Sequence, residues 1–177
     1  MATANVEHKQ PRPPPPHRAS SPTKLTDRFE WFLEKATEIG ITQITPILCQ
    51  HSERKIIKPL RYQKIILSAA KQSLKYHFPE LHPICSFKDF LEKQEDAPHQ
   101  KLIAHCQGIE KKSLKSLLKP KGNHIILVGP EGDFSSEEIT LATSMGYTGV
   151  SLGENRLRTE TAAIVACHSV AYSNEVE

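Results

Sequence analysis

The chain has 177 residues, of which 38% are apolar and 24% charged, with 23 Lys and Arg against 20 Asp and Glu. This length and composition fit one soluble domain with a single hydrophobic core. A net charge of +3 is too small to indicate a nucleic-acid partner, so such a partner has to be inferred from where the basic residues cluster.

The cysteines and histidines argue against a disulfide framework and a metal centre. The four cysteines are widely spaced without a C-x-x-C pair, which is typical of buried, reduced thiols in a cytoplasmic protein. The nine histidines show no metal-ligand spacing, so we expect no metal. No apolar run approaches the ~20 residues that span a bilayer. We therefore expect a soluble protein that acts in the cytoplasm without a membrane partner.

The N-terminal segment differs in composition from the rest of the chain. Residues 1–23 hold six of the 13 prolines and almost no large apolar side chain. This composition predicts a disordered Pro-rich tail, followed by one domain over residues 24–177. A ligand for a proline-binding groove and an organelle-targeting sequence are alternatives to a simple linker.

From residue 26 onward, helical and strand patterns alternate. Apolar residues at helical spacing before Gly40 predict a first helix, residues 43–48 a first strand, and Pro59 the first turn of a second helix ending near residue 76. The later predicted elements are a strand over 82–85, a helix after Ser86, a strand over 102–106, a lysine-rich helix over 109–118, a strand over 124–128, a helix that follows the capping box of Ser135 and Glu138 and ends at Gly146, a strand over 148–152 and a helix over 159–172.

Such alternation predicts an α/β fold in which a mainly parallel sheet is flanked by helices, with the ligand crevice beyond the carboxyl ends of the strands. Two loops fall at such ends. Gly129 and Gly132 frame the first, where a cofactor cradle and a tight structural turn are equally good readings. The second opens with Gly153 and brings Arg158 and Glu160 to a helix start, which favours a binding site.

Several motifs in one order resemble the ribosomal RNA small subunit methyltransferase E family, a member of the SPOUT class of methyltransferases. The resemblance spans residues 24–175. It is carried by Phe29-Glu30-Trp31, Glu34 to Gly40, Ile44-Thr45-Pro46, Gln72-Ser73, Pro79, Gly129-Pro130-Glu131-Gly132, Leu152-Gly153 and Leu157-Arg158-Thr159-Glu160-Thr161-Ala162.

The resemblance implies a C-terminal trefoil knot, a homodimer, S-adenosyl-L-methionine as cofactor, and methylation of a uridine at N3 in 16S rRNA of the small ribosomal subunit. It also implies which residues surround the cofactor. These are Ala104, His105, Gly129, Pro130, Glu131, Gly132, Leu152, Gly153, Leu157, Thr161 and Ala162.

Two charged residues are candidates for catalysis. Glu160 is our candidate base for the weakly acidic uracil N–H, and Arg158 is suited to negative charge on the uracil oxygens or to a phosphate. A structural ion pair between Arg158 and Glu160 is an equally good alternative. Trp31 lies between Phe29 and Phe32 and is expected in the core rather than as a stacking surface for a base.

Basic residues near the second predicted helix form a candidate RNA surface, although a solvated lysine face is the usual meaning of such a run. The residues proposed to bind RNA are Arg54, Lys55, Arg61 and Lys75. A second basic run, over 111–121, is a weaker candidate.

The sequence also departs from the family's pattern. Family members usually carry an N-terminal RNA-binding domain where this chain has its Pro-rich segment. The alternative function is therefore a truncated, non-catalytic module that binds the cofactor or dimerises. Asp133 stands where the family commonly has a second glycine, and Lys75 where it tends to have arginine.

Overall fold

A computed structural model describes residues 17–20, 26–53, 55–108 and 111–175. Residues 1–16 and 21–25, which make up most of the predicted tail, lie outside this part of the chain. So do Arg54 and the first residues of the predicted helix over 109–118.

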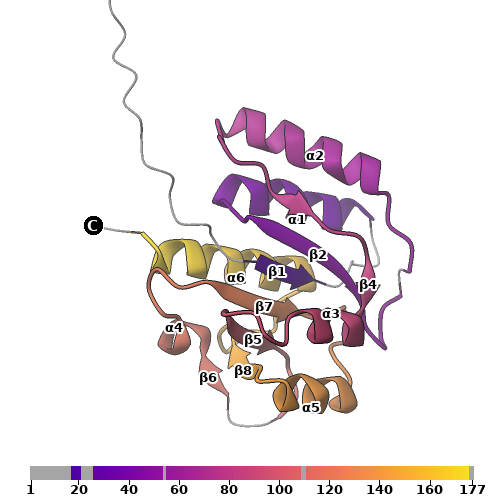
Figure 1. The fold of residues 1–177 in the computed structure, drawn as a ribbon, viewed down its shortest axis with the longest axis vertical. Helices are drawn as coiled ribbons and strands as arrows, with labels where there is room; N and C mark the ends of the chain where they lie inside the picture. The colour runs from indigo at the N-terminus through magenta and orange to yellow at the C-terminus, as the bar shows by residue number, and fades with distance from the viewer. Residues whose placement is uncertain (1–16, 21–25, 54, 109–110, 176–177) are drawn as a thin grey trace, which may run out of the picture.

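One eight-stranded sheet runs through the molecule, and every strand pair in it is parallel, as the sequence predicts (Figure 1). The order is β3-β2-β1-β7-β5-β8-β6, with β4 also paired to β2. The strands are β1 His17–Ser20, β2 Gln43–Leu48, β3 Glu80–Leu81, β4 Cys85–Ser86, β5 Gln100–Ala104, β6 Lys112–Ser113, β7 His124–Val128 and β8 Thr148–Ser151.

Strand β1 corrects the predicted domain boundary. His17–Ser20 were expected in the tail, yet they pair with β2 on one side and β7 on the other. The central strand of a parallel sheet usually reads as an apolar run, whereas His-Arg-Ala-Ser does not. Its position is therefore set by its neighbours rather than by its own pattern.

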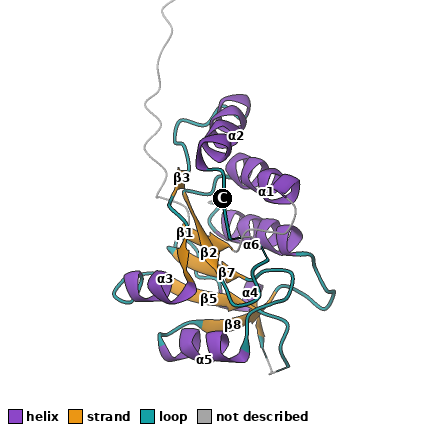
Figure 2. Cartoon of the chain, turned by 90° about the vertical axis from the view of Figure 1, so that its right-hand side faces the viewer, coloured by secondary structure: helices purple, strands orange, loops and turns teal. Residues whose placement is uncertain are grey.

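Helices cover both faces of the sheet, with α1, α2 and α6 on one side of the strands and α3 and α5 on the other (Figure 2). Each face has its own apolar core. On the first, Phe29, Leu33 and Val170 pack against alternate strand residues such as Ile126. On the second, Phe90 and Phe134 belong to the cluster that holds Ile125 and Leu127. The helices are α1 Thr26–Ile39, α2 Pro59–Gln72, α3 Phe87–Lys93, α4 Leu114–Leu117, α5 Ser136–Ser144 and α6 Thr159–Ser173.

Local chemistry explains where the helices begin. Ser86 caps α3, and Ser135 and Glu138 form the predicted capping box at the start of α5. Gly40, with a φ of 108°, ends α1 as predicted, and Gly146 follows the end of α5 with a φ of 85°.

Three predicted elements differ from the structure. Helix α2 ends at Gln72 rather than near residue 76, and Leu74 beyond it has the left-handed φ of 53°. The predicted strand over 82–85 is replaced by two short strands, β3 and β4. In place of the long helix over 109–118, β6 precedes the one-turn helix α4, because Ser113 caps the chain there through the N–H of Ser116. Within the described residues, no helix has the length and apolarity needed to cross a membrane.

Candidate functional site

Three loops emerge side by side at the carboxyl edge of the sheet. Ala104 at the end of β5 is in register with Val128 at the end of β7 and with Val150 in β8. The segments that follow these strands therefore start from one edge, where α/β folds bind their ligands. The predicted cofactor residues lie in or directly after these three segments.

The two glycines of the 129–134 loop pack closely against their neighbours. A Cβ on Gly132 would lie 2.9 Å from the Cβ of His51, and a Cβ on Gly129 would lie 3.1 Å from the ring of Phe134. Phe134 is fully buried. Close packing therefore favours glycine at both positions.

Asp133 fastens this loop to the segment after β5. It has the left-handed φ of 64° that favours glycine, and aspartate is among the residues that tolerate it. Its Oδ2 accepts a hydrogen bond from the backbone N of Cys106 at 2.7 Å, and its carbonyl oxygen lies 3.1 Å from Nδ1 of His51. The amide of Gln107 also donates to the Phe134 carbonyl, at 2.7 Å. The loops after β2, β5 and β7 thus form one connected support.

His105 is half-buried directly beyond β5. A Cβ on Gly149 would lie 2.9 Å from its Nε2, and the Lys111 ammonium donates a hydrogen bond to its carbonyl oxygen. Burial and then the charge of Lys111 lower the pKa of His105, while Asp133 opposes them. The neutral imidazole is therefore favoured at this edge.

The loop after β8 supplies an open stretch of backbone. Gly153 has a φ of 131°, and a Cβ there would meet no atom within 4 Å. Ser151 holds the turn, since its hydroxyl bonds both to the N–H and to the carbonyl of Gly153. Leu152, Leu157 and Ala162 around it are half-buried. Accessible backbone beside half-buried aliphatic groups fits the adenosine part of S-adenosylmethionine.

A depression of about 350 Å³ lies between the first turns of α1 and α6. Both helices begin at the carboxyl edge, because each follows a parallel strand. Its lining residues are Asp27, Arg28, Trp31, Arg158, Glu160 and Thr161.

Glu160 is 8% exposed and lies beside Arg28, with 3.6 Å between Oε1 and the arginine Nε. Its Oε2 is buried and has no hydrogen-bond partner among the described residues. No ion pair joins Glu160 to Arg158 in this part of the chain, so the alternative of an Arg158–Glu160 pair is wrong. Arg158 is exposed at the N-cap position of α6.

Sequence reasoning missed Asp27 and Arg28 and misplaced Trp31. Trp31 is 44% exposed while Phe29 and Phe32 are buried, because the helical period turns residue 31 away from the core. Because no strand was predicted before this helix, the sequence did not place residues 27 and 28 at the same sheet edge as the loops.

Of the predicted RNA-binding residues that the structure describes, Lys55 precedes α2, Arg61 lies on it and Lys75 follows it. Lys55 is exposed before the helix. Arg61 is engaged by Glu30 of α1, since its Nη2 donates to Oε2 at 2.7 Å and its Nε lies 2.6 Å from Oε1. Lys75 is half-buried beyond the end of α2. Arg61 thus has an ion-pair partner on α1, and the three described residues are spread over the start, body and end of the α2 segment.

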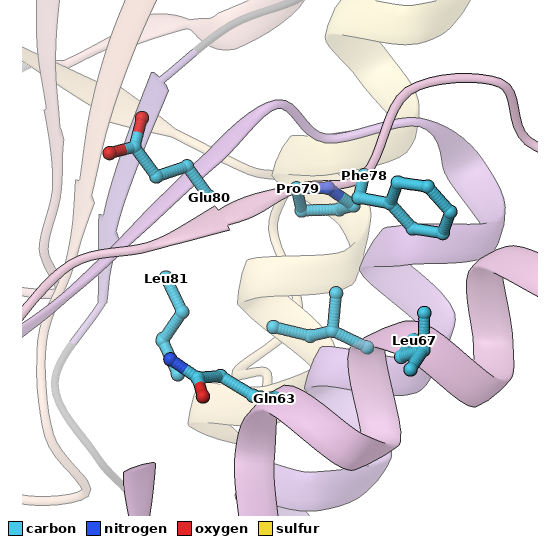
Figure 3. Close-up of a pocket in the computed structure, with 7 residues that line it drawn as sticks. Gln63, Leu67, Phe78, Pro79, Glu80 and Leu81 are labelled. Carbon is cyan, nitrogen blue, oxygen red and sulfur yellow. The ribbon is translucent and has the colours of Figure 1, made fainter. Parts of the chain in front are cut away.

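A second cavity, of about 290 Å³, lies between α2 and β3 (Figure 3). Gln63 and Leu67 on the helix face the segment over 78–81, and the Glu80 side chain points away from the helix. This cavity contains none of the predicted site residues.

The prediction for the cysteines is correct in part. All four are free thiols, and Cys49 and Cys167 are buried, but Cys85 is half-buried and Cys106 is exposed at the site edge. Among the described residues, no group of three or more His, Cys, Asp or Glu is placed to hold a metal ion.

Comparison with known proteins defines the class first: the RNA methyltransferase domain family matches residues 12–171. A probable rRNA-methyltransferase from Porphyromonas gingivalis has 37% identity and a TM-score of 0.82, over 93% of this chain and 71% of that one. This confirms the parallel α/β architecture of the SPOUT methyltransferases.

The particular family follows from two further relatives. Ribosomal RNA small subunit methyltransferase E from Mesomycoplasma hyopneumoniae is 35% identical over 144 residues, 78% of this chain and 62% of the relative. The enzyme of that name from Neisseria gonorrhoeae, solved bound to S-adenosyl methionine, has 30% identity and a TM-score of 0.75, over 88% of this chain and 64% of that one. This chain belongs to the ribosomal RNA small subunit methyltransferase E family. It spans 62%, 63% and 59% of the length of three curated relatives.

Proposed function

We propose that this chain is an S-adenosylmethionine-dependent methyltransferase that methylates N3 of a uridine in 16S rRNA of the small ribosomal subunit. The observation that carries the proposal is the single sheet edge shared by three loops and by the buried, unpartnered oxygen of Glu160. Family membership supports the methyl transfer and the ribosomal substrate.

The cofactor would be held by the loops after β5, β7 and β8. Ala104 and His105 border it from β5, Gly129 to Gly132 from β7, and Leu152, Gly153 and Leu157 from β8, with Thr161 and Ala162 on α6. When bound, S-adenosylmethionine supplies an electrophilic methyl group. The neutral form favoured at His105 adds no positive charge beside a cationic sulfonium.

Glu160 and Arg158 prepare the uracil for attack. The N3–H bond breaks, its proton passes to Oε2 of Glu160, and the electron pair stays on N3. N3 then bonds to the methyl carbon, and the pair of the broken C–S bond stays on sulfur. Arg158 balances the negative charge that develops on the uracil oxygens in the meantime. Alignment of N3 with the methyl group supplies the remainder of the rate enhancement.

The enzyme is proposed to act in the cytoplasm as a homodimer. Arg54, Lys55 and Lys75 are proposed to contact RNA, and Arg61 to do so when it is released from Glu30. Sedimentation of the purified chain tests the dimer, and salt-dependent binding to small ribosomal subunits tests the basic residues.

The decisive experiment is methyl transfer from labelled S-adenosylmethionine to unmodified small ribosomal subunits, with nucleoside mass spectrometry of the product. We expect 3-methyluridine. Glu160→Gln should abolish single-turnover transfer, whereas Glu154→Gln, an exposed residue of the same loop, should retain it. Label on another atom of the RNA contradicts the proposal, and cofactor binding without transfer supports a non-catalytic module.

A further inference from the structure

The cavity between α2 and β3 leaves apolar side chains exposed to solvent. Phe78 is 54% exposed and Leu67 is 43% exposed. Figure 3 shows Phe78 and Pro79 on one side of the cavity and Leu67 on the other. An aromatic ring and a proline ring beside aliphatic groups are typical of surfaces that bind Pro-rich segments. The cavity therefore suits a segment of that kind.

The chain enters the sheet close to this cavity. His17, the first residue of β1, is in register with Gln43 of β2, and Gln43 is in register with Glu80 of β3. Because the three strands are parallel, the chain before His17 and the chain before Glu80 meet the sheet at the same edge. Two inter-strand spacings separate them, which is roughly 10 Å. Phe78 and Pro79 directly precede β3 and so lie at this edge.

The segment before β1 has the composition and the length to reach the cavity. Five of the six residues 11–16 are prolines. Proline-rich sequences favour the extended polyproline II conformation, which rises about 3.1 Å per residue. In that conformation residues 13–16 span about 12 Å, enough to cross from β1 to β3. Binding such a segment costs little conformational entropy, because each proline already has a fixed φ.

The charges of the segment and of the cavity are complementary. Among the described residues that line the cavity, Glu80 alone is charged. Its side chain is 63% exposed and points away from α2 (Figure 3), and Nδ1 of His82 lies 3.7 Å from its Oε1. Residues 8–16 contain Lys9 and Arg12 and no carboxylate. Arg12 directly precedes four prolines, so it comes within reach of Glu80 when those prolines cross the sheet edge.

We propose that residues 11–16 of this chain bind in the cavity between α2 and β3, with prolines packed on Phe78 and Leu67 and with Arg12 paired to Glu80. The contact ties the beginning of the chain to β3, the strand at the end of the sheet order. Because the segment and the cavity belong to one chain, the effective concentration is in the millimolar range and a weak contact suffices. A concentration about four times the Kd gives roughly 80% occupancy. The proposal does not depend on cofactor, RNA or methyl transfer.

Photo-crosslinking of the full chain tests where the segment lies. Phe78 is replaced by p-benzoylphenylalanine, which inserts into C–H bonds that it touches on irradiation, and the products are digested and identified by mass spectrometry. We expect cross-links to residues 11–16. Lys88 is exposed on α3, at the opposite face of the sheet (Figure 2), and is the matched control position. It should give roughly fivefold less of this product. Cross-links to another segment, equal yields at the two positions, or no cross-link at all overturn the proposal.

Charge reversal tests the pairing of Arg12 with Glu80. Arg12→Glu and Glu80→Arg should each lower the cross-link yield at position 78 roughly threefold, as expected when binding weakens about tenfold. The double variant restores the pair with opposite polarity and should recover most of the yield. Lys9→Glu is the control within the same segment and should have a smaller effect than Arg12→Glu. A double variant without recovery, or an equal loss in Lys9→Glu, overturns the pairing.

Two deletions measure what the contact adds to folding. Removing residues 1–16 should lower the folding equilibrium constant roughly fivefold, which is the factor that the stated occupancy supplies. Removing residues 1–10 keeps every proposed contact and should leave the constant unchanged. Urea denaturation measures both, and equal constants overturn the proposal. Cross-links that join two chains, identified by the mass of the product, would show that a second copy occupies the cavity and overturn it as well.

Discussion

The carboxylate of Asp133 accepts a hydrogen bond from the backbone N–H of Cys106, with 2.7 Å between the two atoms. This contact joins the segment after β5 to the glycine loop after β7. Asp133 also has a left-handed backbone conformation, so both its side chain and its backbone shape the loop after β7. This edge of the sheet is therefore held together by an aspartate at a position where glycine would satisfy the backbone alone.

Replacing Asp133 with alanine should lower the free energy of unfolding by about 2 kcal/mol, because alanine strains at a positive φ and leaves the Cys106 N–H without its acceptor. The Asp133→Asn variant tolerates the backbone conformation and keeps an acceptor, so its loss should stay below about 1 kcal/mol. Urea denaturation measures both. Equal losses would show that the side-chain contact carries little of the stability.

Gly132→Ala should destabilise the loop by roughly 1–3 kcal/mol, since the new Cβ would lie 2.9 Å from that of His51. Gly108→Ala is the matched control, because a Cβ there meets nothing within 4 Å, and it should change stability by less than about 0.5 kcal/mol. Calorimetry should show weaker S-adenosylmethionine binding for Gly132→Ala alone. Adding His51→Gly removes the contacting atom and should restore part of the loss.

The ion pair between Arg61 and Glu30 makes a prediction about RNA binding. Glu30→Gln should increase affinity for small ribosomal subunits by freeing the guanidinium, and it should steepen the salt dependence. Arg61→Ala should leave affinity close to that of the parent chain. The double variant should lose the gain of Glu30→Gln. A large loss of affinity in Arg61→Ala would show that Arg61 binds RNA despite its partner.

His105 should make stability depend on pH. Its pKa is lowered in the folded chain, chiefly by burial, so the folded state binds fewer protons than the unfolded state. The contribution of His105 to the free energy of unfolding is fully present above the pKa of the unfolded state, and it falls as the pH drops below that value. The loss between about pH 7.5 and 5.5 should shrink in His105→Gln and persist in His168→Gln, an exposed control. Denaturation at several pH values measures this, and identical curves would exclude His105 as a cause.

Strand β1 predicts which truncations are tolerated. Removing residues 1–16 leaves the sheet intact, whereas removing residues 1–23 deletes β1 and exposes the edges of β2 and β7. Unpaired strand edges promote aggregation. We expect the longer deletion to be insoluble or unfolded, as judged by size-exclusion chromatography and circular dichroism. A folded, monodisperse product would place the domain start at residue 24 after all.

Much of the fold was predictable because its signals are local. The capping box of Ser135 and Glu138, the glycine after α1 and the apolar runs of β2 and β7 each determine their own segment. The short elements were not predicted correctly, because their signals are not local. The polar strand β1 and the two-residue strands β3, β4 and β6 exist only through pairing with distant partners.

The loops of the candidate site could be predicted from the sequence, but the depression between α1 and α6 could not. Glycines and charges after two predicted strands pointed to the carboxyl edge. The contact between Arg28 and Glu160 joins the beginning and the end of the chain, and no spacing rule relates them. Likewise, the contact of Arg61 with Glu30 could not be predicted, because a charge in a sequence does not reveal the carboxylate that it meets in space.

The place of β1 also bears on how the protein folds. Its Arg18 is in register with Ile44 and with Ile126, so the strand lies between β2, the next strand in the chain, and β7, which comes much later in the sequence. A growing chain exposes β1 early, yet β7 leaves the ribosome only after most of the domain has been made. Pairings between such distant segments slow folding and prolong the lifetime of open strands. This protein should therefore complete its sheet late in synthesis and benefit from a chaperone that shields β1 and β2 until β7 arrives.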